Sequence, residues 1–293
     1  MAKLGEINYL RNLGDYVLRH AGKKPFCDDD CPKYLTLIGT VMSLLPPPPA
    51  RLLDLGCGPG WTSVFFAKRG YEVVGVDIAA DMIALANQAR ERECLENLHF
   101  VEADYEDLTF QNEFDCVVFY DSLHHAVDEE TALRRACQAL KPEGMLVTSE
   151  PGEGHQDSPG ALEARKYDIT EKDMPPDKII GMARRLGFGQ FRVFPHSYDL
   201  LHLFEHVFYS HQKPARPEHR LENAGFWKRL FHGLLRKRLG IGAQDYATLM
   251  NELPWFLFLS HNKPVLDKQL SIIRRSSGIV AMVKEGPAAV RAS

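Results

Sequence analysis

The stretch Arg51-Leu52-Leu53-Asp54-Leu55-Gly56-Cys57-Gly58-Pro59-Gly60-Trp61 joins a buried-strand pattern to a glycine-rich turn and a helix start. Its leucines form a short apolar run suited to a strand that is covered on both faces. Gly56, Gly58 and Gly60 let the backbone turn sharply and approach a ligand with no Cβ atoms in the way. A helix over 61–69 would follow at once and point unpaired backbone N–H groups at the crevice. The stretch therefore predicts a ligand cradle of the nucleotide-binding type.

The bulk composition of the 293-residue chain is that of an ordinary soluble globular protein. Its formal net charge of −4, with acidic and basic residues mixed throughout, argues against nucleic acid or an anionic membrane as a partner. No apolar run approaches the roughly 18 to 20 residues of a membrane span, and the N-terminus lacks the apolar region of a signal peptide. We therefore expect a cytoplasmic protein with no membrane span.

The six cysteines are scattered over residues 27–137 and do not form the pattern of a disulfide framework. Cys27 and Cys31 enclose three aspartates and could form half of a metal site. The sequence has no second Cys/His pair at zinc-finger spacing, so a solvated acidic turn is favoured there. The segment His202-Leu203-Phe204-Glu205-His206 matches a zinc-peptidase pattern. We discount that match, because five-residue patterns recur by chance in a His-rich segment. No metal is expected.

The chain before the cradle, residues 1–49, is expected to form two helical pieces and to end in the spacer Pro46-Pro47-Pro48-Pro49, which cannot be helical. From residue 51 on, strands and helices alternate at the spacing of βαβ units, which predicts a parallel sheet. Further strands are expected at 71–78, 97–104, 114–122 and 145–149, and helices at 81–92 and 129–140.

The composition of the sequence changes after Glu150. Residues 151–160 form a long polar loop rich in helix breakers, and loops of this kind are usually functional. A helix over 175–186 and strands at 190–194 and 278–284 complete a core of residues 50–197 plus 278–285. The aromatic-rich stretch 198–277 is expected to be a mostly helical insertion, either a cap over the site or a dimer surface.

In an open parallel sheet the ligand lies outside the carboxyl ends of the strands, so the residues there are the candidates. An acid that ends the second strand about 20 residues past the glycine turn is placed to accept hydrogen bonds from ribose hydroxyls, and Asp77 stands at this position. The other candidates at strand ends are Ile78, Asp104, Tyr105, Asp121, His124, His125 and Glu150. A dinucleotide and an adenosyl group would both fit.

The glycine spacing separates these two ligands. Gly56, Gly58 and Gly60 follow the pattern Gly-x-Gly-x-Gly, whereas the dinucleotide fingerprint has its third glycine one residue later, where this chain has Trp61. A bulky tryptophan argues against close packing around a pyrophosphate, and Asp54 would repel one. A carboxylate at that place suits a cationic ligand better.

The segment 53–60 resembles the first motif of the class I S-adenosylmethionine-dependent methyltransferases. Segments 74–78, 102–104, 114–118 and 140–146 resemble that family's second-strand acid motif, adenine-side motif, fourth strand and turn into the fifth strand. The likeness covers residues 50–151 well and 175–195 and 278–284 loosely. It implies an α/β fold with a Rossmann-like, seven-stranded, mostly parallel sheet flanked by helices, with a helical insertion before the last strand.

The resemblance also implies the cofactor, S-adenosyl-L-methionine, and roles for named residues. The glycines would line its methionine and ribose parts, Asp77 would hold the ribose hydroxyls, Asp104 and Tyr105 would flank the adenine, and Asp121 would contact the methionine part. The full expected cofactor set is Asp54, Gly56, Cys57, Gly58, Gly60, Trp61, Asp77, Ile78, Met82, Asp104, Tyr105 and Asp121. Asp104 has an alternative role as the cap of the turn that follows it. Cys57 is interpreted as a small turn residue, not a nucleophile, because no partner base is visible.

Methyl transfer from a sulfonium needs positioning of the acceptor and, for an alcohol, removal of its proton. His124, His125 and His155 are the candidate bases. The alternative for the adjacent pair is that one packs inward while the other caps the next helix. Glu150 would bind a substrate hydroxyl or amine, or only anchor the loop that follows it.

The sequence favours methylation of a hydroxyl, less so an amine, on a small-molecule or sugar or glycan acceptor. Two alternatives stay open: a C-methyltransferase of a quinone or lipid-like acceptor, and a non-catalytic scaffold subunit that binds S-adenosylmethionine. A nucleic-acid acceptor is disfavoured, because Asp121-Ser122-Leu123-His124 stands where an Asn/Asp-Pro-Pro-aromatic element would be. A homodimer is one possible assembly.

Overall fold

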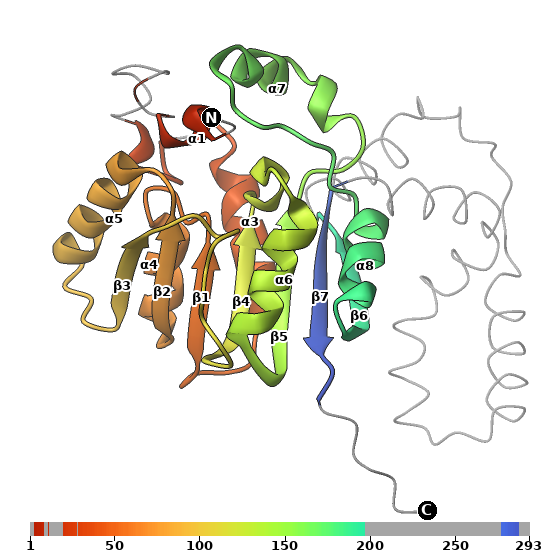
Figure 1. The fold of residues 1–293 in the computed structure, drawn as a ribbon. Coiled ribbons are helices and arrows are strands. Elements are labelled where there is room, and N and C mark those ends of the chain that lie inside the picture. The colour runs from red at the N-terminus through yellow and green to blue at the C-terminus, as the bar shows by residue number, and fades with distance from the viewer. Residues whose placement is uncertain (1–2, 9–10, 12–19, 28, 197–276, 287–293) are drawn as a thin grey trace, which may run out of the picture. The chain divides into compact units, whose positions relative to one another are not determined.

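The computed structural model describes residues 3–8, 11, 20–27, 29–196 and 277–286. Its centre is a seven-stranded sheet in the order β3-β2-β1-β4-β5-β7-β6 (Figure 1). The first five strands run parallel, while β7 is antiparallel to both β5 and β6. The strands are β1 (Arg51–Leu55), β2 (Glu72–Asp77), β3 (Leu98–Glu102), β4 (Phe114–Tyr120), β5 (Leu140–Glu150), β6 (Phe188–Pro195) and β7 (Gly278–Lys284). The predicted seven-stranded, mostly parallel sheet is confirmed.

Helices cover both faces of this sheet. They are α1 (Leu4–Ile7), α3 (Cys31–Leu44), α4 (Trp61–Arg69), α5 (Ala80–Arg92), α6 (Glu129–Ala139), α7 (Pro159–Ala164) and α8 (Pro176–Arg185), with short 3-10 turns η1 (Leu123–His125), η2 (His155–Asp157) and η3 (Arg165–Tyr167). None of the helices that the structure describes is long and apolar enough to cross a membrane. The insertion expected over 198–277 lies, apart from Ser277, outside the described residues, and so does the His202 to His206 pattern.

The alternation of side chains along β4 shows why the sheet needs two layers of helices. Val117 and Phe119 belong to a buried cluster with Leu133 of α6, while Val118 belongs to another with Phe66 of α4. All five side chains are fully buried. A strand with both faces covered is a continuous apolar run, which is the pattern that identified these strands in the sequence.

Two predictions differ from the structure by more than a residue or two at the end of an element. β5 begins at Leu140, not at residue 145, because Leu140 pairs with Phe114 before the register shifts. The loop expected after Glu150 contains η2 and α7, and the Ser158 side chain caps α7 by accepting a hydrogen bond from the Ala161 N–H. All six cysteines are free, as predicted.

Residues 151–175, which we call the strap, connect β5 to α8 and lie beside α1 at the carboxyl ends of the strands (Figure 1). The Thr170 N–H donates to the Glu6 carboxylate at 2.9 Å. A Cβ atom added at Gly5 would stand 2.2 Å from the Asp168 carbonyl oxygen, so α1 touches the strap backbone directly. The strap and α1 together cover the edge of the sheet where a ligand is expected.

Candidate functional site

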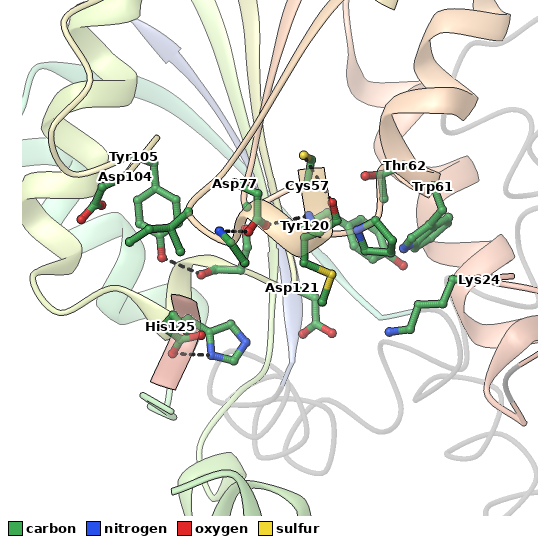
Figure 2. A pocket seen from close by; sticks show the side chains of 18 of the residues that line it. Lys24, Cys57, Trp61, Thr62, Asp77, Asp104, Tyr105, Tyr120, Asp121 and His125 are labelled. Carbon is green, nitrogen blue, oxygen red and sulfur yellow. Dashed lines mark hydrogen bonds and ion pairs between the residues drawn. The ribbon is translucent and has the colours of Figure 1, made fainter. Parts of the chain in front are cut away.

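A cavity opens at the carboxyl ends of β1, β2 and β4, where the strand order reverses on either side of β1 (Figure 2). Among the predicted cofactor residues, those that line it are Gly56, Cys57, Gly58, Trp61, Asp77, Ile78, Met82, Asp104, Tyr105 and Asp121. Asp54 and Gly60 do not line it. Of the four catalytic candidates, only His125 does.

The three glycines of the turn all have positive φ, but their surroundings differ. A Cβ atom at Gly60 would stand 2.6 Å from the Phe100 ring, and one at Gly56 would stand 2.5 Å from the Ser122 Cβ atom. A Cβ atom at Gly58 would meet no described atom within 4 Å. Gly56 and Gly60 are therefore required by packing, whereas Gly58 leaves open space in the cavity.

Asp54 lies beneath the turn and is 1% exposed. Its Oδ2 atom accepts hydrogen bonds from the Thr62 hydroxyl at 2.7 Å and the Ser63 hydroxyl at 2.6 Å, while Oδ1 is buried with no described partner. Burial raises the pKa of Asp54 to about 6, although the two hydroxyl groups oppose the shift. The carboxylate holds the start of α4. It does not face the cavity, although the sequence predicted that it would contact the cofactor.

Asp77 ends β2 and joins the turn to the next helix. Its Oδ2 atom accepts from the Gly58 N–H at 2.8 Å, and Oδ1 accepts from the Ala79 N–H at 2.9 Å. Burial raises the pKa of this carboxyl, and the backbone N–H groups oppose the rise. Asp77 therefore fixes the turn while it lines the cavity.

Asp104 combines the two roles that the sequence left open. Its Oδ1 atom accepts from the Glu106 N–H at 2.9 Å, which caps the turn, and it also lines the cavity. Lys3 of the N-terminal segment forms ion pairs with Asp104 and, at 2.8 Å, with Glu106. The Tyr105 hydroxyl donates to the Ser122 carbonyl at 3.1 Å, which holds its ring at the cavity wall.

Aromatic rings form the wall beyond the turn. The Trp61 ring meets Tyr120 edge-on, with centroids 5.3 Å apart, and lies 6.0 Å from Tyr34. Tyr34, Tyr120, Lys3, Glu6 and Lys24 also line the cavity, and none of them was predicted from the sequence. Tyr120 is the last residue of β4, so its place at a strand end was a usable signal in the sequence. The others come from the N-terminal segment, for which the sequence carried no site signal.

Asp121 follows β4 directly and has a φ of +53°. Its N–H donates to the Ser149 carbonyl at 2.8 Å, which fixes the turn. Burial alone would raise the pKa of its carboxyl, but the nearby positive charges of His124 and Lys24 outweigh burial and lower it. The cavity wall therefore carries an ionised carboxylate.

Glu150 is fully buried at the end of β5. Its carboxylate accepts from the N–H groups of Ser122, Leu123 and His124 at 3.2, 2.9 and 3.3 Å, and from the His124 ring Nδ1 at 2.8 Å. Since these four donors occupy it, Glu150 anchors η1 and does not reach the cavity. Of the two roles proposed from the sequence, the structure supports anchoring.

The three histidines lie in different settings. His124 is 3% exposed, and its ion pair with Glu150 outweighs burial and raises its pKa to about 9. The His155 Nε2 atom lies 2.8 Å from the Glu171 carboxylate, outside the cavity lining.

His125 lines the cavity, and its Nδ1 lies 2.7 Å from the Thr170 carbonyl oxygen. Because a carbonyl only accepts, Nδ1 carries the proton and Nε2 of the neutral ring keeps its lone pair. Burial, together with the charge of His124, lowers the pKa of His125.

A family model described as a methyltransferase domain matches residues 52–144. This range runs from β1 into β5 and holds the glycine turn, Asp77 and Asp121. By this match, residues 52–144 form a methyltransferase domain, and their motifs are those of the class I S-adenosylmethionine-dependent type. The seven-stranded sheet of the chain and the cavity at the strand ends agree with that family.

Among similar proteins, a ubiquinone biosynthesis O-methyltransferase of Hydrogenovibrio crunogenus is 28% identical over 46% of this chain and 61% of its own length. A tRNA 5-carboxymethoxyuridine methyltransferase of Escherichia coli K12 is 30% identical over 36% of this chain and 42% of its own length. The chain thus spans about half the length of these curated relatives.

A solved structure supports the fold. Phosphoethanolamine N-methyltransferase 2 of Haemonchus contortus, in complex with S-adenosyl-L-methionine, has a TM-score of 0.53 and 18% identity. The match covers 87% of this methyltransferase chain and 53% of the other.

The residues at the cavity fit the cofactor of the family. The open space in front of Gly58 leaves room for a ligand against the turn. Asp77, Asp104 and Asp121 present carboxylates to the cavity, and Tyr105 presents a ring. Carboxylates would accept hydrogen bonds from ribose hydroxyls or an ammonium group, and a ring would pack against adenine. The donor set therefore suits an adenosyl group that carries a cationic amino-acid tail.

Proposed function

We propose that this chain transfers a methyl group from S-adenosylmethionine to a hydroxyl group of a small-molecule or sugar acceptor. The observation that carries the proposal is that the glycine turn and His125 line one cavity, with the Nδ1 atom of His125 held by the Thr170 carbonyl. When bound, the cofactor supplies a methyl group on a positively charged sulfur.

His125 is placed to act as the general base. The Thr170 carbonyl holds its Nδ1–H, so Nε2 is the atom that accepts a proton. The acceptor oxygen would lose its proton to Nε2 as it gains the methyl group, and the sulfur would keep the electron pair of the broken bond. Because Thr170 belongs to the strap, the position of the base depends on the strap.

The other walls suit a charged donor. The ionised Asp121 balances positive charge, and Trp61 and Tyr120 line the same cavity with aromatic rings of the kind that attract a cation. The strap and α1 lie over the same edge and would help to keep water out. These contacts position the donor, which is the main requirement for methyl transfer.

The acceptor side is polar. Glu6 and His125 line it, and burial raises the pKa of Glu6 to about 7. Such groups recognise hydroxyls, which supports a small hydroxylated molecule or a sugar. The second candidate acceptor is a quinone precursor, methylated at oxygen or carbon, and the name of the Hydrogenovibrio relative favours it.

A transfer assay with S-adenosylmethionine labelled in its methyl group tests the proposal. We expect label to reach hydroxylated sugars or phenols in a panel that also includes quinone precursors, amines and tRNA. The variant His125→Ala should lower kcat about 100-fold or more while the affinity for S-adenosylhomocysteine stays within about twofold. His99→Ala, at an exposed position on β3, is the control.

Two results would contradict the proposal. Full turnover by His125→Ala would show that His125 is not the general base. Cofactor binding with no transfer to any acceptor in the panel would favour the non-catalytic scaffold.

A further inference from the structure

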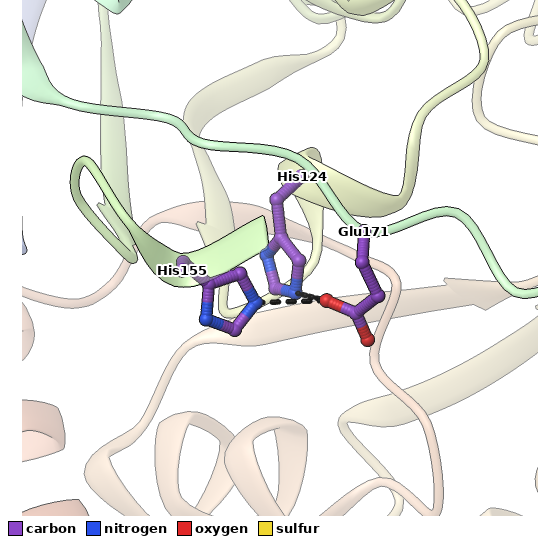
Figure 3. A group of neighbouring side chains, drawn as sticks. All are labelled: His124, His155 and Glu171. Carbon is purple, nitrogen blue, oxygen red and sulfur yellow. Dashed lines mark hydrogen bonds and ion pairs between the residues drawn. The ribbon is translucent and has the colours of Figure 1, made fainter. Parts of the chain in front are cut away.

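Outside the cofactor cavity, three side chains from separate segments converge at the base of the strap (Figure 3). His124 comes from η1, His155 from η2, and Glu171 from the strap between η3 and α8. One donor atom of each lies within 4.8 Å of the other two. The cofactor cavity uses none of the three.

The spacing of these atoms suits one small cation. The Glu171 Oε2 atom lies 2.8 Å from the His155 Nε2 atom and 3.6 Å from the His124 Nε2 atom. Bonds of about 2.0 to 2.1 Å in a tetrahedral zinc site put donor atoms about 3.4 Å apart. Two imidazoles and one carboxylate with an open fourth position form a donor set typical of zinc.

Glu150 orients the His124 ring for metal binding. It accepts the hydrogen bond from the His124 Nδ1–H at 2.8 Å and is itself fixed by three backbone N–H groups. The His124 ring is therefore held with Nε2 3.6 Å from Glu171, and this atom would lose its proton when a metal binds. A carboxylate behind a ligating histidine is the usual support of a metal site.

The negative charges at the cluster also favour binding of a cation. Within the described part of the chain, the ion pairs of Glu150 and Glu171 are all with histidines, and no lysine or arginine reaches them. Neutral, ligating imidazoles would leave two negative charges in a largely buried place. One divalent ion would balance both.

We propose that His124, His155 and Glu171 bind one divalent metal ion of the zinc type, which fastens the strap to η1. The ion stabilises the position of Glu171. Its neighbour Thr170 contacts His125 through its carbonyl oxygen and Glu6 through its N–H. The ion holds the strap in place, and its binding does not depend on methyl transfer. The competing arrangement is the same cluster held by hydrogen bonds alone, with protonated histidines in place of the metal.

Metal binding can be measured on the untagged full chain. After removal of metal with a chelator, titration with zinc chloride should show one ion per chain, whereas magnesium chloride should show none, because magnesium prefers oxygen ligands. His155→Ala, at a partly exposed position, should weaken zinc binding at least tenfold. Glu171→Gln should do the same. Zinc should raise the Tm of the wild type and not that of either variant.

Two controls locate the ion. His99→Ala removes an exposed histidine elsewhere and should leave zinc binding unchanged. The double variant His202→Ala with His206→Ala removes the other zinc-like pattern of the sequence and should also leave it unchanged. Zinc binding that survives in His155→Ala and Glu171→Gln, or that is lost in the double variant, would overturn the proposal. So would the absence of zinc binding to the wild type.

Discussion

The glycine turn and the strap both border the ligand edge of the sheet, yet they are held in different ways. The turn is tied to the end of β2 by the bond from the Gly58 N–H to Asp77, 19 residues away. The strap is tied to the N-terminal segment by the bond from the Thr170 N–H to Glu6, 164 residues away. The donor side can therefore be recognised from a contiguous motif, whereas the acceptor side depends on tertiary packing. The predictions below test this difference.

The largest effect is expected on the strap side at Glu150. Replacing it with alanine leaves three backbone N–H groups and the His124 ring without their acceptor in a fully buried place. We expect Glu150→Ala to lower the free energy of unfolding by about 4 to 5 kcal/mol. Urea unfolding in the presence of a chelator measures this without any metal contribution. Glu150→Gln, which keeps one acceptor oxygen, should cost less. Equal stability of Glu150→Ala and wild type would show that Glu150 is not the anchor.

On the donor side, two glycines form a matched pair. In Gly60→Ala the new Cβ atom stands 2.6 Å from the Phe100 ring at a φ of +80°, so we expect a loss of about 3 to 4 kcal/mol. Gly58→Ala has the space for a Cβ atom and should cost about 1 kcal/mol. Its effect should appear instead as weaker binding of S-adenosylhomocysteine, because the methyl group enters the cavity. The distinction fails if Gly60→Ala is as stable as Gly58→Ala.

Asp54 should make the free energy of unfolding depend on pH. Folding raises its pKa from the ordinary value of 3.8 to about 6, so the folded chain holds this proton more tightly than the unfolded chain. Its contribution therefore becomes less favourable as the pH rises from about 4 to about 6. Relative to Asp54→Asn, the wild type should lose about 2 to 3 kcal/mol of stability over that range. Urea unfolding of both proteins at pH 4, 5, 6 and 7, without cofactor, measures the difference. A difference that stays constant with pH would contradict the burial of a charged Asp54.

The smallest effect is expected at Lys3. Its ion pairs with Asp104 and Glu106 are partly exposed, so Lys3→Ala should change stability by less than about 1 kcal/mol. Thermal unfolding at low and high salt measures it, and a larger loss would mean that the N-terminal segment stabilises the core.

The sequence was sufficient to predict the sheet, because apolar strands, breakers and helical periodicity are local signals. It also identified about half of the cavity lining, since residues such as Asp77 and Asp121 follow directly from strand ends. It did not separate His124 from His125, although they are adjacent. Which of them faces the cavity is decided by Glu150 and Thr170, which come from distant parts of the chain. Lys3, Lys24 and Tyr34 were missed for the same reason, because only folding brings the N-terminal segment to the strand ends.

The central claim is that the cavity beside the glycine turn binds the methyl donor. Isothermal titration with S-adenosylhomocysteine tests it directly on the wild type and on Asp77→Ala, with thermal unfolding to show that both are folded. We predict one site per chain in the wild type and a loss of affinity of about 30-fold or more in Asp77→Ala, because the ribose hydroxyls lose their acceptor and the turn loses its tie to β2. No binding to the folded wild type, or equal affinity in the two proteins, would contradict the account.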